Sequence, residues 1–297
     1  MDLATLAVFR AVAREESITR AAELLGRVPS NVTTRIQQLE AEIGVALFAR
    51  ETRRMVLTSE GKTYLDYAER ILNLADEARQ QINPEGPGGT LRIGSMESTV
   101  ASRLPSLLAA FNRDWPEVTI ELSTAPTRQL VDAVQAHRID CALIAIAADD
   151  SWSALDAVET VSVFRERLVL LLPKGHHAVR SPADVKPMAL AAFAPGCTYR
   201  MLAEEWLMGG SAARARLKIQ EVGSYHAMFA CTAAGTCVSV MPKSVADTLS
   251  HLGSVEEHEL MAVDTHLACR PGFATPAFLE WRKRLLTASN IEPSTSA

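Results

Sequence analysis

Apolar residues recur every three or four positions through the first 82 residues, which is the spacing of amphipathic helices. Asp2 is placed to cap a first helix, and a short second helix ends at Gly26. Pro29 opens a third helix, because a proline at the first helical position loses no backbone hydrogen bond. Gly44 ends this helix, whose apolar face is formed by Val32, Ile36, Leu39 and Ile43. The pattern predicts three helices with a tight turn between the second and the third.

Two apolar arms around a basic, polar tip predict a small β-hairpin over residues 47–57. Thr58 then caps a long helix that runs to about Ile82, so we expect a first domain over residues 1–58 and a linker helix over 59–82. Spacings of three and four along that helix are typical of a two-helix coiled coil. We therefore expect dimerisation through Leu65, Ala68, Leu72 and Ala75. The proline- and glycine-rich stretch 83–89 predicts a hinge and the domain boundary.

After the hinge, β-rich runs alternate with amphipathic helical segments up to about residue 290. The β-rich runs cover residues 90–95, 118–122, 140–146, 167–173, 237–242 and 265–270. The helical segments cover residues 101–114, 127–137, 199–208 and 275–288. Strands that alternate with helices predict a parallel sheet covered by helices on both faces, in a second domain over 90–290. We expect residues 291–297 to be a disordered tail.

Composition places the chain among ordinary globular proteins that stay inside the cell. It has 297 residues, of which 48% are hydrophobic and 22% charged, and its net charge is −5, so a nucleic-acid site must be a local patch. The cysteines follow no metal-site or CxxC spacing, and we expect reduced thiols at Cys141, Cys197, Cys231, Cys237 and Cys269. Neither a signal peptide nor an apolar run of membrane-spanning length is found, which predicts a cytoplasmic protein with no membrane partner.

The polar face of the third helix carries side chains suited to DNA. A short helix, a tight turn and a second helix can place the second helix in the major groove, where hydroxyl, amide and guanidinium groups reach phosphates and base edges. Residues 18–62 hold seven basic and five acidic residues, a local net charge of +2. The predicted DNA contacts are Arg20, Ser30, Asn31, Thr33, Thr34, Arg35 and Gln38, together with Arg50, Arg53 and Arg54 on the hairpin.

These residues carry a resemblance to a known family. The segment SITRAAELLGRVPSNVTTRIQQLEAEIGVALFARETRRMVLTSEG resembles the winged helix-turn-helix of LysR-type transcriptional regulators, and the likeness covers nearly all of residues 1–82. The resemblance implies binding to an imperfect inverted repeat of double-stranded DNA as a homodimer or homotetramer, with RNA polymerase as a further partner. Where family members commonly read Ser-Gln-Pro, this chain has Val28, Pro29 and Ser30. No operator sequence is therefore carried over.

The rest of the chain resembles the effector domain of the same family. The resemblance implies a multidomain α/β protein: a mostly α winged helix-turn-helix, a long linker helix and a two-lobed α/β domain like a periplasmic binding protein. Lobe I would cover about 90–162 and 266–290, and lobe II about 163–265. A small effector would bind between the lobes, beyond the carboxyl ends of strands. The expected effector contacts are Ser95, Met96, Glu97, Ser98, Thr99, Pro126, Thr127, Thr198, Tyr199, Arg200 and Tyr225.

The chemistry of the effector is left open by these residues. Arg200 could pair with a carboxylate. Glu97 could face the amine of an amino-acid-like effector, or it could only stabilise a helix N-terminus. Ser98 and Thr99 are equally suited to ligand binding and to helix capping. We read Cys197 as a small apolar filler rather than a redox sensor.

Other functions find less support in the sequence. His176 and His177 are adjacent, unlike a helical metal-binding pair, so we expect a surface loop, no metal and no cofactor. No P-loop, GxGxxG, GxSxG or HExxH motif indicates an enzyme. A solute-binding protein without a DNA role is the alternative that the second domain alone would suggest. The sequence predicts a DNA-binding regulator controlled by a small molecule, and leaves open whether it activates or represses.

Overall fold

The computed structural model describes residues 2–51, 54–82, 86–147, 153–209 and 217–289. The chain divides into two compact units, one of Met1–Pro84 with Ala136–Arg138 and one of the remaining residues. Part of the expected hinge (83–85) and the whole expected tail (291–297) lie outside the described residues.

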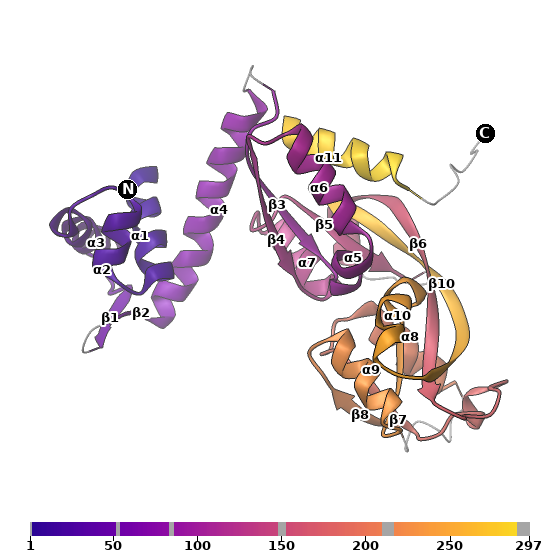
Figure 1. Ribbon diagram of the computed structural model, residues 1–297. Helices are drawn as coiled ribbons and strands as arrows, with labels where there is room; N and C mark the ends of the chain where they lie inside the picture. The colour runs from indigo at the N-terminus through magenta and orange to yellow at the C-terminus, as the bar shows by residue number, and fades with distance from the viewer. Residues whose placement is uncertain (1, 52–53, 83–85, 148–152, 210–216, 290–297) are drawn as a thin grey trace. The chain divides into compact units, whose positions relative to one another are not determined.

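The first unit is built from helices with one β-hairpin (Figure 1). Asp2 caps the first helix by accepting a 2.6 Å hydrogen bond from the Thr5 N–H, and Ser17 caps the second in the same way. Gly44 ends the third helix in the left-handed conformation at φ 85°, which favours glycine. The elements are α1 (Leu3–Glu15), α2 (Ile18–Leu24), α3 (Pro29–Ile43), β1 (Phe48–Glu51), β2 (Arg54–Leu57) and α4 (Ser59–Gln81).

The long helix α4 corrects the predicted dimerisation face. Ala68 and Leu72 are buried in the core of their own unit together with Phe9 and Leu39, and Leu65 packs against the same core. Three of the four predicted residues therefore lie on the face with which α4 closes its own helical core, whereas Ala75 is half-buried and does not belong to that core. The periodicity was right for an apolar face, but it does not say whether a core or a second chain covers that face. A different apolar stripe is exposed on α4, formed by Tyr67, Ile71 and Leu74.

The second unit is an α/β structure around one eight-stranded sheet, of order β4-β3-β5-β10-β6-β9-β7-β8. Its strands are β3 (Gly89–Ser95), β4 (Val118–Thr124), β5 (Cys141–Ile146), β6 (Glu159–Pro173), β7 (Ala189–Ala192), β8 (Lys218–Glu221), β9 (Val238–Pro242) and β10 (Val255–Cys269). Its α-helices are α5 (Glu97–Ser102), α6 (Leu104–Asp114), α7 (Thr127–Gln135), α8 (Thr198–Leu207), α9 (Tyr225–Ala233), α10 (Lys243–Leu249) and α11 (Pro276–Thr287).

Two long strands join the lobes and depart from the predicted parallel sheet. Within the lobes, β3 pairs in parallel with β4 and β5, and β7 pairs in parallel with β8 and β9, as predicted. β6 and β10 run antiparallel to each other and to their neighbours, and each has 15 residues. The sequence predicted only one half of each strand. That half is buried on both faces and therefore forms a continuous apolar run, which is the signal that the prediction used. Figure 1 shows both strands passing from one lobe to the other.

Successive residues of a strand pack into different hydrophobic cores, because their side chains point alternately to the two faces of the sheet. Leu168 and Leu170 of β6 face a core shared with α7 and α8, whereas Val169 faces α9 and α10. A third core lies under α6 and α11, where Phe111 and Trp281 meet edge to face with ring centroids 5.5 Å apart. The five cysteines are free. No helix within the described ranges has the length and apolar character that crossing a membrane requires.

Candidate DNA-binding surface and effector cavity

The outward face of α3 presents a row of polar side chains. Ser30, Asn31, Thr34 and Gln38 are exposed, and Thr33 is half-buried. The Thr33 and Thr34 hydroxyls donate 2.9 Å hydrogen bonds to the carbonyls of Pro29 and Ser30. These hydroxyl protons are thus used within the helix. Only the oxygen lone pairs and the methyl groups of the two threonines are left for contacts with another molecule. The opposite face, with Val32 and Ile36, is buried.

Arg35 is held at the start of α1 instead of extending freely. Its Nη1 donates a 3.1 Å hydrogen bond to Thr5 Oγ1 and lies 3.7 Å from Asp2 Oδ1. Asp2, Thr5, Asn31, Thr34, Arg35 and Gln38 line one polar groove between the two helices, with Leu39 and Glu42. The sequence predicted Asp2 as a cap and gave Thr5 no role. A contact between residues thirty positions apart, such as Thr5 and Arg35, cannot be predicted from a local sequence pattern.

Two further basic side chains are exposed elsewhere on the unit, beside the end of α1. Arg20 is exposed and lies 3.3 Å from the Glu15 carboxylate, and exposed Arg54 lies 3.4 Å from the Glu16 carboxylate. Both ion pairs are at the surface, where such pairs contribute little to stability, so either guanidinium can exchange its partner for a phosphate. Arg53 and the side chain of Arg50 lie outside the described residues.

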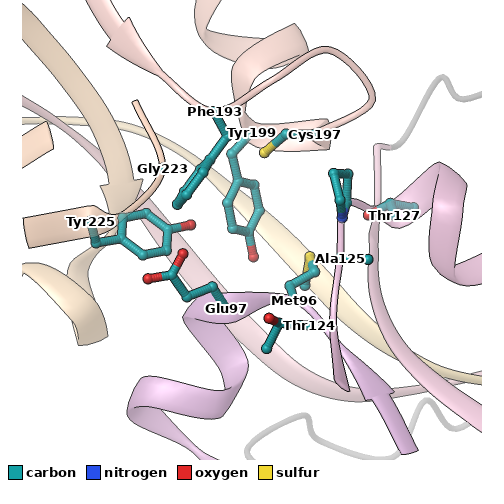
Figure 2. Close-up of a pocket in the computed structure, with 11 residues that line it drawn as sticks. Met96, Glu97, Thr124, Ala125, Thr127, Phe193, Cys197, Tyr199, Gly223 and Tyr225 are labelled. Atoms are coloured by element: carbon teal, nitrogen blue, oxygen red, sulfur yellow. The ribbon is translucent and has the colours of Figure 1, made fainter. Parts of the chain in front are cut away.

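A cavity of about 190 Å³ lies between the two lobes of the second unit. Lobe I contributes the start of α5 and the segment that joins β4 to α7, and lobe II contributes the starts of α8 and α9. Figure 2 shows Phe193, Tyr199 and Tyr225 gathered around the space beside the Glu97 carboxylate. The lining residues are Met96, Glu97, Thr124, Ala125, Pro126, Thr127, Phe193, Cys197, Tyr199, Gly223 and Tyr225.

Six of the predicted effector contacts line this cavity: Met96, Glu97, Pro126, Thr127, Tyr199 and Tyr225. Ser95, Ser98, Thr99, Thr198 and Arg200 do not line it. Buried Ser95 donates a hydrogen bond to the Met96 carbonyl. The Thr198 hydroxyl lies 3.0 Å from the Ala145 carbonyl and 3.1 Å from Thr127 Oγ1, so its one proton is shared with groups of the other lobe.

Arg200 is bound by groups of its own lobe. Its Nε donates a 2.6 Å hydrogen bond to Glu204, and its Nη1 lies 2.7 Å from the Phe193 carbonyl and 3.3 Å from Glu221. Two carboxylates therefore compensate the one guanidinium. The spacing of Arg200 and Glu204, four residues apart on one helix, is the sequence signal for this pairing.

Glu97 is a half-buried carboxyl at the cavity. Burial raises its pKa above the ordinary value, because removal of water disfavours the charged form. A hydrogen bond from the Tyr225 backbone N–H and the nearby His226 ring act in the opposite direction and lower the pKa. The carboxyl is thus costly to ionise in the absence of a cation in the cavity.

A cluster of buried hydroxyl groups lies at and behind this wall, formed by Ser98, Tyr199 and Thr265. Burial, followed by the Glu166 charge, raises the pKa of Tyr199, and hydrogen bonding with the Thr265 and Ser98 hydroxyls partly offsets this rise. The Tyr199 hydroxyl is thus held by neighbouring hydroxyl groups of the protein.

The sequence did not single out Phe193 or Gly223, and it did not predict Cys197 as a ligand contact. Phe193 follows the short strand β7 in a segment of alanines and prolines, where an isolated aromatic residue carries no local signal. Its ring meets Tyr225 edge to face with centroids 4.9 Å apart. A search of strand ends for aromatic residues beside cavity-forming helices would have found it.

Comparison with known proteins identifies the class defined by this fold. The family described as "Bacterial regulatory helix-turn-helix protein, lysR family" matches residues 3–62, and the family described as "LysR substrate binding domain" matches residues 84–289. The chain belongs to the LysR family of bacterial transcriptional regulators. It therefore has a DNA-binding helix-turn-helix domain and an effector-binding domain, and its relatives are regulators rather than enzymes.

Relatives match the chain along most of its length. An uncharacterised HTH-type transcriptional regulator of Bacillus subtilis, YusT, is 37% identical over 88% of this chain and 85% of its own length. The transcriptional regulator GltR of the same species is 35% identical over 88% and 86%. The solved structure of full-length CbnR with its target DNA has a TM-score of 0.67 and 22% identity, over 97% of this chain and 100% of that one.

Proposed function

We propose that this regulator binds operator DNA through the polar face of α3 and the basic residues beside it, and that an effector in the cavity between the lobes controls this binding. The observation that carries the DNA-binding part is the exposed row of Ser30, Asn31, Thr34 and Gln38 on a helix whose other face is buried. Such a helix can enter the major groove without unfolding its own core. CbnR, a protein of the same fold, has been solved with its target DNA.

Two copies of the chain would read an imperfect inverted repeat. The stripe of Tyr67, Ile71 and Leu74 on α4 offers an apolar surface at spacings of four and three, which suits a partner helix. A symmetric dimer then presents two copies of α3 to two half-sites. We propose a homodimer as the DNA-binding pair, a homotetramer as its larger assembly, RNA polymerase as a partner at the promoter, and the bacterial cytoplasm as the location.

Effector control requires that the ligand binds two arrangements of the protein with different affinity. The cavity is lined by both lobes, so a ligand in it contacts residues of each and changes their relative stability. The expected carboxylate partner Arg200 is outside the lining and already faces Glu204 and Glu221. We therefore assign the polar recognition of the effector to Glu97 instead of Arg200.

The test begins with genome-wide mapping of bound sites and proceeds to a gel shift on one recovered operator at fixed salt. Arg35→Ala and Thr34→Ala are expected to weaken binding by about 1–3 kcal/mol each, because each removes a groove group that contacts a base or a phosphate. Arg113→Ala is the matched control, since it removes an equal charge from an exposed position in the other unit. Unchanged operator affinity in both α3 variants would contradict the assigned surface.

A further inference from the structure

The cavity between the lobes has an unusual balance of charge. Within the described residues, its lining holds one acidic side chain, Glu97, and no basic one. The remaining lining groups are aromatic, aliphatic, sulfur-containing or hydroxyl-bearing. We propose that the effector of this cavity is a small organic amine, bound as its ammonium cation between Glu97 and the rings of Phe193, Tyr199 and Tyr225. This inference rests on the proposed function and names the chemical class of its effector.

The three aromatic rings provide a wall that favours a cation. Phe193 and Tyr225 lie edge to face at 81°, and Figure 2 shows the Tyr199 ring beside them, above Met96 and Glu97. The face of an aromatic ring is electron-rich and attracts ammonium groups, and cages of this kind recognise ammonium ligands. The same rings exclude water, which strengthens the attraction between a ligand cation and the Glu97 carboxylate.

Arg200 and three backbone N–H groups beside the cavity are already engaged by the protein. Arg200 faces two carboxylates and the Phe193 carbonyl. At the N-termini of the helices, the Tyr225 N–H hydrogen-bonds Glu97, and the N–H groups of Tyr199 and Arg200 hydrogen-bond the Cys197 sulfur. A carboxylate ligand would therefore meet Glu97 without a compensating cation in the described lining, and like charges at short range repel.

The Glu97 carboxyl accepts hydrogen bonds, which favours an amine that carries N–H groups. A primary ammonium has three N–H donors to offer the Glu97 oxygens, whereas a quaternary ammonium has none. The cavity of about 190 Å³ is slightly larger than an engineered cavity of about 150 Å³ that holds benzene, so the apolar part has roughly the size of one ring or a short alkyl chain.

The experiment measures binding of matched compounds to the full-length protein by thermal unfolding and calorimetry at pH 7.5. The amines are benzylamine and isoamylamine, compared with benzyl alcohol, isoamyl alcohol, benzoate and isovalerate, and with benzyltrimethylammonium. The amines are expected to raise Tm while the alcohols and carboxylates do not, and Glu97→Gln is expected to weaken amine binding at least tenfold. Glu117→Gln, which removes an equal charge from an exposed position outside the lining, should leave amine binding unchanged.

The outcomes separate the two proposals. Stronger binding of the carboxylates, or an amine affinity that Glu97→Gln does not reduce, would overturn the inference and leave an effector cavity in place. Failure of the amines, alcohols, carboxylates and benzyltrimethylammonium alike to bind the wild-type protein would count against both. Amine binding that leaves operator affinity unchanged in a gel shift would support the ligand class and contradict effector control. Circular dichroism and operator binding of Glu97→Gln verify that this variant is folded.

Discussion

At the residue scale, the cavity holds an acid in a place that disfavours its charge. The pKa of Glu97 is raised because the carboxyl is partly buried beside aromatic rings. A raised pKa in the folded protein means that this group favours folding most below its ordinary value of 4.5, and that this contribution is lost as the pH rises through the folded-state pKa. Acids held in this way are common at binding sites, where function and stability conflict.

We predict that Glu97→Gln stabilises the ligand-free protein at pH 7, because glutamine keeps the size of the side chain and removes the cost of ionisation. The gain in Tm over wild type should shrink as the pH falls from 7 toward 4.5, and thermal unfolding across that range measures it. The His226 ring lies near Glu97 and lowers its pKa, so the double variant Glu97→Gln/His226→Gln is compared with His226→Gln alone. A lower Tm for Glu97→Gln at pH 7 would contradict the prediction.

Residue-level prediction from the sequence succeeded where a side chain's role depends on its own neighbours in the chain. Asp2 and Ser17 cap helices as their positions indicate, and Gly44 takes the left-handed conformation that ends α3. Arg200 illustrates the limit. Its position at the start of α8 suggested an anion partner, but Glu221, contributed by β8, reaches it from a distant part of the chain.

At the element scale, α4 has two apolar faces, of which one is buried and the other is exposed. Ala68 and Leu72 are covered by the core of the same unit, whereas the side chains of Tyr67, Ile71 and Leu74 are 55%, 40% and 51% exposed. In the proposed dimer, this exposed stripe is the surface that pairs with the partner helix. Sequence periodicity found a face, and only the packing of α1 against α4 distinguished the core face from the free one.

We predict that Ile71→Asp converts the dimer to a monomer, because it places an unpaired charge in the middle of the stripe. Sedimentation velocity at micromolar concentration measures the change. Arg79→Asp is the control, since Arg79 is exposed and lies five residues beyond Leu74 on a different face of the helix. A dimer that survives Ile71→Asp would remove the stripe from the interface.

The length of β6 and β10 was missed for a physical reason. The half of β6 with Leu168 and Leu170 is buried on both faces and reads as a continuous apolar run, while the other half alternates with exposed Arg165 and Arg167. Nothing in the local sequence indicates that this alternating half of β6 and the apolar run after it form one continuous strand. The strand therefore emerges only from pairing with β10 along its whole length.

At the scale of the whole effector unit, one buried ion pair ties the lobes to the strands between them. Arg103, at the end of α5, donates a 2.6 Å hydrogen bond to Glu166 of β6, and Ser244 of α10 donates to the other Glu166 oxygen at 2.8 Å. The Glu166 side chain is 6% exposed. Helices of both lobes thus meet on a single carboxylate of a connecting strand.

We predict that Glu166→Ala lowers the free energy of unfolding by about 1–3 kcal/mol, because Arg103 and Ser244 lose a buried partner. Urea unfolding followed by circular dichroism measures this loss. Glu256→Ala, at an exposed position on β10, serves as the control. An unchanged midpoint for Glu166→Ala would show that the pair carries no net stability.

The core shared by α7 and α8 extends beneath both lobes without a break, from Val131 through Leu170 to Leu207. Each lobe also has a core of its own, under α6 and α11 in lobe I and under α9 and α10 in lobe II. Either lobe expressed alone would therefore keep one core but expose its share of the common apolar layer to water, which favours aggregation.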